Sequence, residues 1–336
     1  MPDMVRAAFV GTLGFLVTSL AACGDDGGST GGTGGAGGGT GAATSSSTST
    51  SASSTGAPGA TTGGGDGGSG SGQGGQGSSV GPGAGGAGGA GGAAPASPGC
   101  GTAPAAGTTS EILDVGGVAR AFVLAIPPGL DGNHGVPLIF GFHGFGGTGE
   151  AASQYFELTG GEAAIYVYPQ ALPLPDQGGG IGWDMRADGV DVAFFDALVE
   201  HLEATQCIDT SRIFAAGHSH GASFSNHLGC YRPEVLRAIA PVAGGGPWAG
   251  ECTGSVSAML THGLADQDVP IDNGIGSRDH WLEVNGCAGA PSAPTDPAPC
   301  VAYEGCTEPV LWCQHDGGHE WPPFAGAGIR QFFLAF

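Results

Sequence analysis

The chain has 336 residues and a formal net charge of −22, with 30 acidic residues against eight arginines and no lysine. This charge argues against nucleic acid or an anionic lipid surface as a partner, because both would repel an acidic protein. Glycine contributes 71 residues, and many of them lie before residue 100. The remaining stretch, from residue 100 to residue 336, has the length of one α/β enzyme domain.

The first residues have the pattern of an export signal. Arg6 supplies positive charge, and residues 7–20 form an apolar run too short to span a bilayer. The sequence Leu20-Ala21-Ala22-Cys23 resembles a bacterial lipobox, in which the cysteine becomes the first mature residue and carries a lipid. We therefore predict a signal peptide over residues 1–22 and a lipid anchor at Cys23 on a bacterial membrane. An ordinary secretory signal is the alternative, and both place the mature chain outside the cytoplasm.

Residues 23–99 are almost entirely Gly, Ser, Thr and Ala. A segment of this composition cannot bury enough apolar surface to offset the entropy lost on ordering. We predict a disordered tether with a root-mean-square reach of roughly 50 Å.

Strand and helix patterns alternate through the domain of residues 100–336. Val192, Phe195, Val199 and Leu202 recur at helical spacing, for example, while short apolar runs elsewhere end at glycine or proline. The alternation predicts an α/β fold, a mostly parallel sheet with helices on both faces. The expected strands cover residues 121–126, 136–142, 163–168, 213–216, 238–242, 256–262 and 310–314, and the expected helices cover residues 191–203, 222–228 and 329–336.

One expected strand runs directly into Gly217-His218-Ser219-His220-Gly221, and a helix pattern follows. This order is typical of a nucleophile elbow, a sharp strand-to-helix turn that exposes a serine above the sheet. The turn strains the serine backbone, and a Cβ at either flank would clash. Ser219 is therefore the candidate nucleophile.

A serine hydroxyl needs a base, and the base needs an acid that orients it. Both follow Ser219 in the order Ser, Asp, His that this kind of fold uses, each just after an expected strand. We predict Asp266 as the acid and His319 as the base. Asp268 and His315 are the alternatives.

The tetrahedral intermediate of acyl transfer needs two hydrogen-bond donors for its oxyanion. The backbone N–H of His220, directly after the nucleophile, is one candidate. The backbone N–H of Phe145, in the glycine-rich loop after the strand of residues 136–142, is the other.

The domain offers two further sets of reactive side chains. His218 and His220 could bind a metal with His315 and His319, but alternate side chains on an elbow project apart, so we expect no metal and no cofactor. An even number of cysteines in an exported domain predicts up to four disulfides, whose pairing the sequence leaves open. They are Cys100, Cys207, Cys230, Cys252, Cys287, Cys300, Cys306 and Cys313.

Several short segments of the domain together form an ordered pattern: residues 143–147, 182–183, 191–194, 207–213, the elbow, 238–244, 262–266 and 317–322. By these segments the domain, from about residue 112 onward, resembles the polyhydroxybutyrate-depolymerase-like and feruloyl esterases of carbohydrate esterase family 1. The resemblance implies an α/β-hydrolase fold, a Ser219, Asp266 and His319 triad, and no metal cofactor. His220 departs from it, because many relatives have a small or amide residue there.

Trp183, Trp321 and Tyr168 are candidate pocket aromatics that would suit a phenolic acyl group. We therefore predict a serine esterase acting on feruloyl or related hydroxycinnamoyl esters of plant polysaccharide. Hydroxyalkanoate oligomers and acetylated xylan are the alternative substrates. A surface lipoprotein that binds ligands on an inactive hydrolase scaffold is the alternative that is not an enzyme.

Overall fold

The computed structural model describes residues 95–160, 164–248, 252–288 and 291–336. The predicted signal peptide, Cys23 and residues 23–94 of the predicted tether lie outside these residues. Within them, no helix combines the length and the apolar character needed to cross a membrane.

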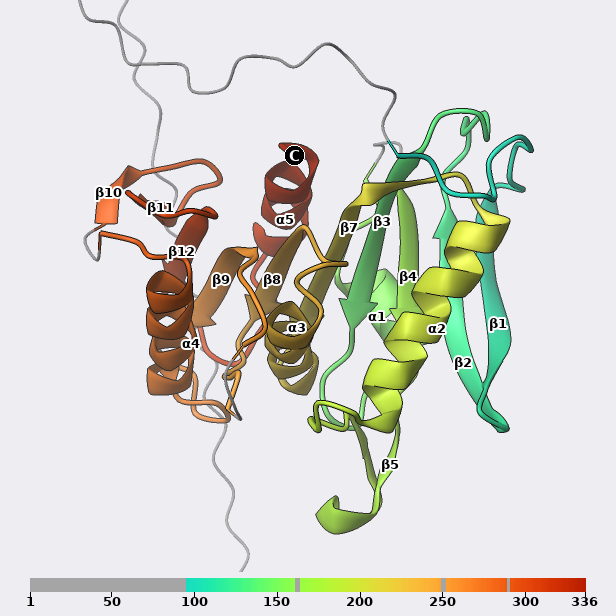
Figure 1. Cartoon of the computed structure of the whole chain (residues 1–336). Coiled ribbons are helices and arrows are strands. Elements are labelled where there is room, and N and C mark those ends of the chain that lie inside the picture. Colours follow the sequence, from blue (N-terminus) through green and yellow to red (C-terminus); the bar gives the residue numbers. More distant parts are fainter. Residues whose placement is uncertain (1–94, 161–163, 249–251, 289–290) are drawn as a thin grey trace, which may run out of the picture. The chain divides into compact units, whose positions relative to one another are not determined.

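The helices and strands alternate along the chain (Figure 1). The strands are β1 (Gly107–Val115), β2 (Val118–Ile126), β3 (Val136–Phe142), β4 (Ile165–Pro169), β5 (Leu172–Leu174), β6 (Gly180–Gly182), β7 (Ile208–His218), β8 (Ala238–Val242), β9 (Ser257–Gly263), β10 (Pro291–Pro294), β11 (Cys300–Tyr303) and β12 (Val310–His315). The helices are α1 (Gly149–Tyr155), the short 3₁₀ helix η1 (Pro175–Gln177), α2 (Val190–Thr205), α3 (His220–Tyr231), α4 (Ile271–Val284) and α5 (Ala325–Leu334).

Ten strands form one sheet in the order β1-β2-β4-β3-β7-β8-β9-β12-β11-β10. The six from β4 to β12 pair in parallel, and antiparallel strands extend the sheet at both edges. The predicted mostly parallel sheet is confirmed. Because parallel strands end at one edge, the loops after β3, β7, β8, β9 and β12 gather there, as ligand-binding loops do in such sheets.

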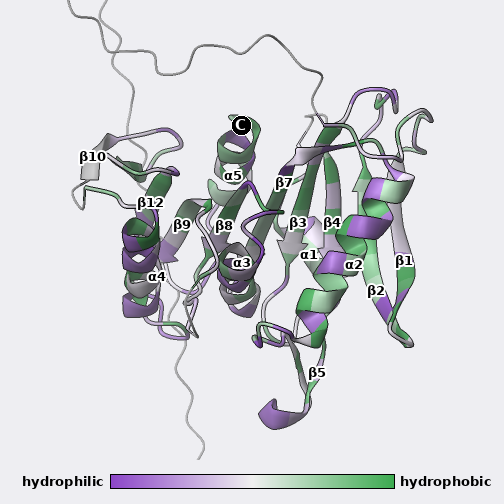
Figure 2. Cartoon of the chain, in the orientation of Figure 1, coloured by the Kyte–Doolittle hydropathy of each residue, from purple (hydrophilic) through white to green (hydrophobic). Residues whose placement is uncertain are grey.

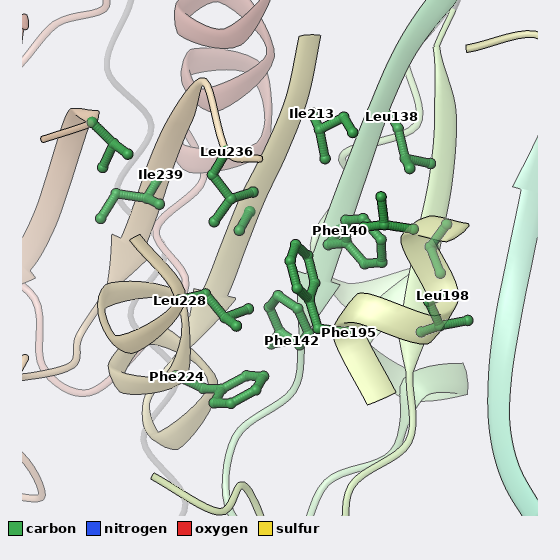
Figure 3. Close-up of a cluster of buried hydrophobic side chains, with 14 of the residues drawn as sticks. Leu138, Phe140, Phe142, Phe195, Leu198, Ile213, Phe224, Leu228, Leu236 and Ile239 are labelled. Carbon is green, nitrogen blue, oxygen red and sulfur yellow. The ribbon is translucent and has the colours of Figure 1, made fainter. Parts of the chain in front are cut away.

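The sheet buries an apolar cluster against helices on each face. Leu138, Phe140 and Phe142 of β3 point to one face, where they pack with side chains of α2 and α3 (Figure 3). Helix α4 covers β9 and β12 on the same face. Ile139 points to the other face, which α1 and α5 cover. This alternation follows from the two-residue repeat of a strand. Figure 2 shows hydrophilic and hydrophobic residues alternating along α2, whose buried side chains Phe195, Leu198 and Leu202 belong to the same apolar cluster as Phe140.

Some elements lack a clear sequence pattern. Helix α4 contains Gly274 and Gly276, which lower helix propensity, so no helix was expected there. Gly274 is needed because a Cβ at this position would lie 2.3 Å from Nδ1 of His262 on β9. Close packing of α4 against the sheet therefore outweighs the low helix propensity of its glycines. The other elements for which the sequence gives no expectation are β1, β5, β6, β10, β11, α1 and η1.

The folded domain begins before the predicted boundary at residue 100. The backbone carbonyl of Pro95 accepts a hydrogen bond from the N–H of Thr210, at 2.9 Å. The Ser97 hydroxyl is buried and accepts a hydrogen bond from the N–H of Ile208, at 2.8 Å. Residues 95–99, assigned to the tether from composition, thus pack against β7 as part of the domain.

All eight cysteines of the domain form disulfides, which confirms that expectation. Cys100–Cys207 joins the start of the domain to the segment after α2. Disulfides persist in oxidising compartments, so the pairing fits an exported protein. The other bonds are Cys230–Cys252, Cys287–Cys306 and Cys300–Cys313.

Candidate active site

Ser219 lies at the junction of β7 and α3 with an unusual backbone. Its φ of 57° and ψ of −120° are strained for a residue other than glycine. The backbone N–H of Ser219 donates to the carbonyl of Val242 at the end of β8, at 2.9 Å, which ties the turn to the sheet. This is the geometry of the predicted elbow.

The two glycines of the elbow are required because a side chain at either position would clash with the backbone. A Cβ on Gly217 would lie 2.3 Å from the carbonyl oxygen of Gly221. A Cβ on Gly221 would lie 2.0 Å from the carbonyl oxygen of Phe142 on β3. Helix α3 therefore starts hard against the neighbouring strand, with its N-terminal N–H groups beside Ser219.

Asp266 and His319 follow the neighbouring parallel strands β9 and β12. His319 Nδ1 and Asp266 Oδ2 are 2.8 Å apart, and the Asp266 carboxylate is fully buried. Asp266 Oδ1 accepts the backbone N–H groups of Asp268, at 3.0 Å, and of Val269, at 2.9 Å. The carboxylate is thus saturated with donors, one of them the imidazole.

The alternative acid and base, Asp268 and His315, do not form such a carboxylate–imidazole pair. His315 Nδ1 accepts the backbone N–H of Gly317 at 3.2 Å and lies 3.7 Å from the Glu320 carboxylate. Asp268 contacts Asp266 through its own backbone N–H. The two loops are joined by the N–H of Ala265, which donates to the carbonyl of Gly317 at 2.9 Å. That bond brings Asp266 and His319 together.

His262 is a further histidine at the buried carboxylate, and the sequence reasoning gave it no role. Its Nε2 lies 2.8 Å from the carbonyl oxygen of Val269 and 3.4 Å from Asp266 Oδ2. Burial acts to raise the pKa of Asp266, but the hydrogen bonds from His319 and from the Val269 N–H outweigh it, so this pKa lies below its ordinary value. Asp266 is therefore ionised at neutral pH.

The glycine-rich loop after β3 passes directly beside Ser219. A Cβ on Gly144 would lie 3.2 Å from Cβ of Ser219. The Gly144 carbonyl is held by His143 Nδ1, at 2.7 Å, and by the N–H of Gly147, at 3.0 Å. Because His143 Nε2 accepts the N–H of Ala171, at 3.2 Å, its Nδ1 carries the proton. The peptide between Gly144 and Phe145 is thus fixed in orientation.

A pocket of about 360 Å³ opens beside Ser219. Two aromatic side chains on its wall are unusually exposed, Trp248 at 62% and Phe145 at 50%. A second cavity, of about 390 Å³, lies between β5 and the start of α2 and shares Gln177 with the first, but Ser219 does not line it. The first pocket is lined by Phe145, Gln177, Ser219, His220, Ser223, Trp248, Asp268, Val269, Pro270 and Asn273.

The three predicted pocket aromatics are buried, and none of them lines the pocket beside Ser219, although Trp183 lines the second cavity. Tyr168 is fully buried among the side chains that cover the α1 face of the sheet. Trp183 stacks on Phe224 and donates its Nε1–H to the carbonyl of His143, at 2.8 Å. Trp321 stacks on Phe156 with ring centroids 4.1 Å apart. None of the three reaches the pocket beside Ser219.

Trp248 was missed, although the sequence held a signal for it. It follows β8 after three glycines, at the same sheet edge as the elbow. An aromatic residue at the carboxyl end of a parallel strand is placed to meet a ligand.

His218 and His220 project to opposite sides of Ser219, as expected for an elbow. The ring centroids of His218 and His319 are 5.0 Å apart, and those of His220 and Phe145 are 5.9 Å apart. Burial and the nearby His319 lower the pKa of His218 to about 4. A different group, Cys230, Cys252 and His280, is close enough to hold a metal, but both sulfurs are bonded to each other.

Comparison with known proteins identifies relatives of the whole domain. The chain is 33% identical over 240 residues to a probable feruloyl esterase C of Aspergillus terreus, covering 67% of this chain and 84% of the relative. It is 32% identical over 258 residues to feruloyl esterase C of Emericella nidulans, covering 70% and 90%. No family model matches the sequence.

A solved structure supports the fold. The acetyl xylan esterase from Aspergillus awamori superimposes with a TM-score of 0.53 at 16% identity, over 68% of this chain and 99% of that protein. At this identity the likeness concerns the fold alone, and the fold is that of the α/β-hydrolases.

Proposed function

The chain belongs to the feruloyl esterases, a family of carboxylic ester hydrolases, and we propose that it cleaves feruloyl or related hydroxycinnamoyl esters of plant polysaccharide. In this proposal Ser219 is the nucleophile, His319 the general base and Asp266 the acid that orients the base. The observation that supports this substrate assignment is the pocket beside Ser219, whose wall exposes two aromatic side chains.

The contacts of Asp266 support this division of roles. An ionised Asp266 accepts the Nδ1–H of His319, so Nε2 of the same ring carries the lone pair that takes the Ser219 proton. As the tetrahedral intermediate collapses, His319 returns that proton to the leaving alcohol oxygen. Asp266 stabilises the imidazolium that exists between these two transfers.

The oxyanion donors in this proposal are the backbone N–H groups of Phe145 and His220. His220 is the first residue of α3, where a backbone N–H has no intrahelical acceptor. In a trans peptide the N–H points opposite to the carbonyl, so fixing the Gly144 carbonyl through His143 also fixes the N–H of Phe145. A donor held in place before the reaction stabilises the oxyanion at little reorganisation cost.

The lining of the pocket supports its assignment to the acyl side of the ester. Ser219 lines it, whereas His319, which must reach the leaving oxygen, is not among its lining residues. An aromatic acyl group would pack against Trp248 and Phe145, and such contacts contribute free energy beyond that of the buried area. A short acetyl group would leave most of this wall unused.

We expect the chain to hydrolyse methyl ferulate with a higher kcat/KM than methyl acetate. Trp248→Ala should lower kcat/KM for methyl ferulate about tenfold and leave methyl acetate nearly unchanged, because a tenfold loss corresponds to about 1.4 kcal/mol, within the range of an aromatic contact. Ile112→Ala, which truncates an exposed side chain on β1 outside the pocket, is the control. Initial rates for both esters decide the matter, and a preference for methyl acetate would refute the aromatic acyl assignment.

We further propose that Cys23 carries a lipid and that residues 23–94 tether the domain to a bacterial membrane. The apolar run before Cys23 and the glycine-rich composition after it support this. In the expression host, Cys23→Ser should move the protein from the membrane fraction to the soluble exported fraction. An unchanged distribution would argue against the anchor.

A further inference from the structure

We propose that the His220 side chain determines acyl specificity, its ring Nε2–H donating a hydrogen bond to an oxygen substituent on the aromatic ring of the bound acyl group. This inference rests on the proposed function, because it assigns an aromatic acyl group to the pocket beside Ser219. It concerns the imidazole of His220, whereas the oxyanion role concerns its backbone N–H.

One hydrogen bond fixes which ring nitrogen of His220 carries the proton. Its Nδ1 accepts the backbone N–H of Trp183, at 3.1 Å. A nitrogen that accepts from an N–H cannot itself be protonated, so in the neutral ring the proton is on Nε2. Burial, together with the nearby His143, lowers the pKa of His220, which keeps the ring neutral at neutral pH.

The ring is also fixed in position. A Cβ on Gly182 would lie 2.9 Å from His220 Nδ1, so only glycine at 182 lets the β6 backbone approach this closely. The Phe145 ring packs edge-on against the His220 ring, with an interplanar angle of 81°. Backbone on one side and an aromatic ring on the other hold the imidazole in one rotamer.

The Nε2–H donor is left available to a ligand. Within the described residues it has no hydrogen-bond partner, and it is not enclosed, unlike Nε2 of His218 and of His315, which are buried without one. His220 lines the pocket with Ser219 and Trp248. Its neighbour Ser223 is already engaged, because its hydroxyl accepts the N–H of Gly245 at 3.2 Å.

Filling the pocket changes the environment of this donor. In the empty pocket Nε2–H faces water, but an aromatic acyl group would displace that water. A donor that loses water and gains no acceptor costs about 1–3 kcal/mol. A site built around such a donor favours a ligand that supplies an oxygen and rejects the same ligand without it. Hydroxylated or methoxylated cinnamoyl groups supply the oxygen, and an unsubstituted cinnamoyl group does not.

The test compares kcat/KM for methyl ferulate, methyl 4-hydroxycinnamate and methyl cinnamate in the full chain. For the wild type we expect a preference of about tenfold for an oxygenated ester over methyl cinnamate. His220→Phe keeps a ring of similar size without a donor and should bring the ratio close to one. His220→Gln places an amide N–H near the Nε2 position and should retain most of the preference.

Inhibition by the free acids separates acyl recognition from the oxyanion hole. Ferulate should inhibit the wild type more strongly than cinnamate does, and His220→Phe should remove that difference. If His220→Phe lowers kcat/KM for the oxygenated and unsubstituted esters equally and weakens inhibition by both acids equally, the side chain only supports the loops. In that case this inference fails while the proposed function stands. If the wild type hydrolyses methyl acetate but no cinnamoyl ester, the proposed function fails and the inference with it.

Discussion

Replacing Ser219 with alanine is expected to lower kcat on methyl ferulate by about 10⁴-fold or more, with the fold intact. Removal of the nucleophile from a serine hydrolase leaves only the contribution of binding and of the oxyanion donors. Alanine removes one oxygen from a turn that the Val242 carbonyl and the flanking glycines hold. The melting temperature should therefore stay within a few degrees of the wild type.

Ser153→Ala serves as the control, because this serine lies on α1 and its hydroxyl donates to the carbonyl of Glu150 on the same helix. It should keep full activity. Residual turnover by Ser219→Ala above about 1% of the wild type would exceed what such residual catalysis allows and would point to another nucleophile. Failure of the wild type to react with a fluorophosphonate probe would favour an inactive, ligand-binding scaffold.

Replacing Asp266 with asparagine is expected to lower kcat by about 10⁴-fold. The asparagine amide can donate to Nδ1 of His319, which would put the proton on Nε2 and leave the base unable to accept from Ser219. The loss should appear in kcat, with KM changed little. Single-turnover rates with methyl ferulate separate the chemical step from product release.

Two further aspartates test whether this effect is specific to Asp266. Asp316→Asn, at an exposed carboxylate in the loop that bears His319, should keep full activity. Asp268→Asn should cost less than tenfold, because its carboxylate does not contact His319 in the pair described above. A larger loss from Asp268→Asn than from Asp266→Asn would reverse the assignment of the acid.

The framework of the site could be predicted from the sequence because it depends on short-range patterns. An apolar run followed by Gly217-His218-Ser219-His220-Gly221 specifies a strand, a strained turn and a helix, and the structure has each in place. The parallel sheet followed from the alternation of element types. Both depend on residues that are close in the chain.

Side-chain partners were harder to predict, because contacts distant in sequence decide them. Asp266 and Asp268 are two residues apart, and His315 and His319 are four apart. Backbone bonds between the two loops, from Leu264 to His315 and from Ala265 to Gly317, set which members of the pairs meet. The burial of individual tryptophans was also difficult to predict. Tryptophan is as suited to a core as to a pocket, and Trp183 and Trp321 pack under the loops while Trp248 is exposed.

The measurement that tests the central claim most directly is the mass of the enzyme quenched with acid during turnover of methyl ferulate. A serine mechanism predicts a feruloyl group bound to the peptide that contains Ser219, and no adduct on Ser219→Ala. A feruloyl group on any other residue, or rapid turnover with the Ser219 peptide unmodified, would contradict the account.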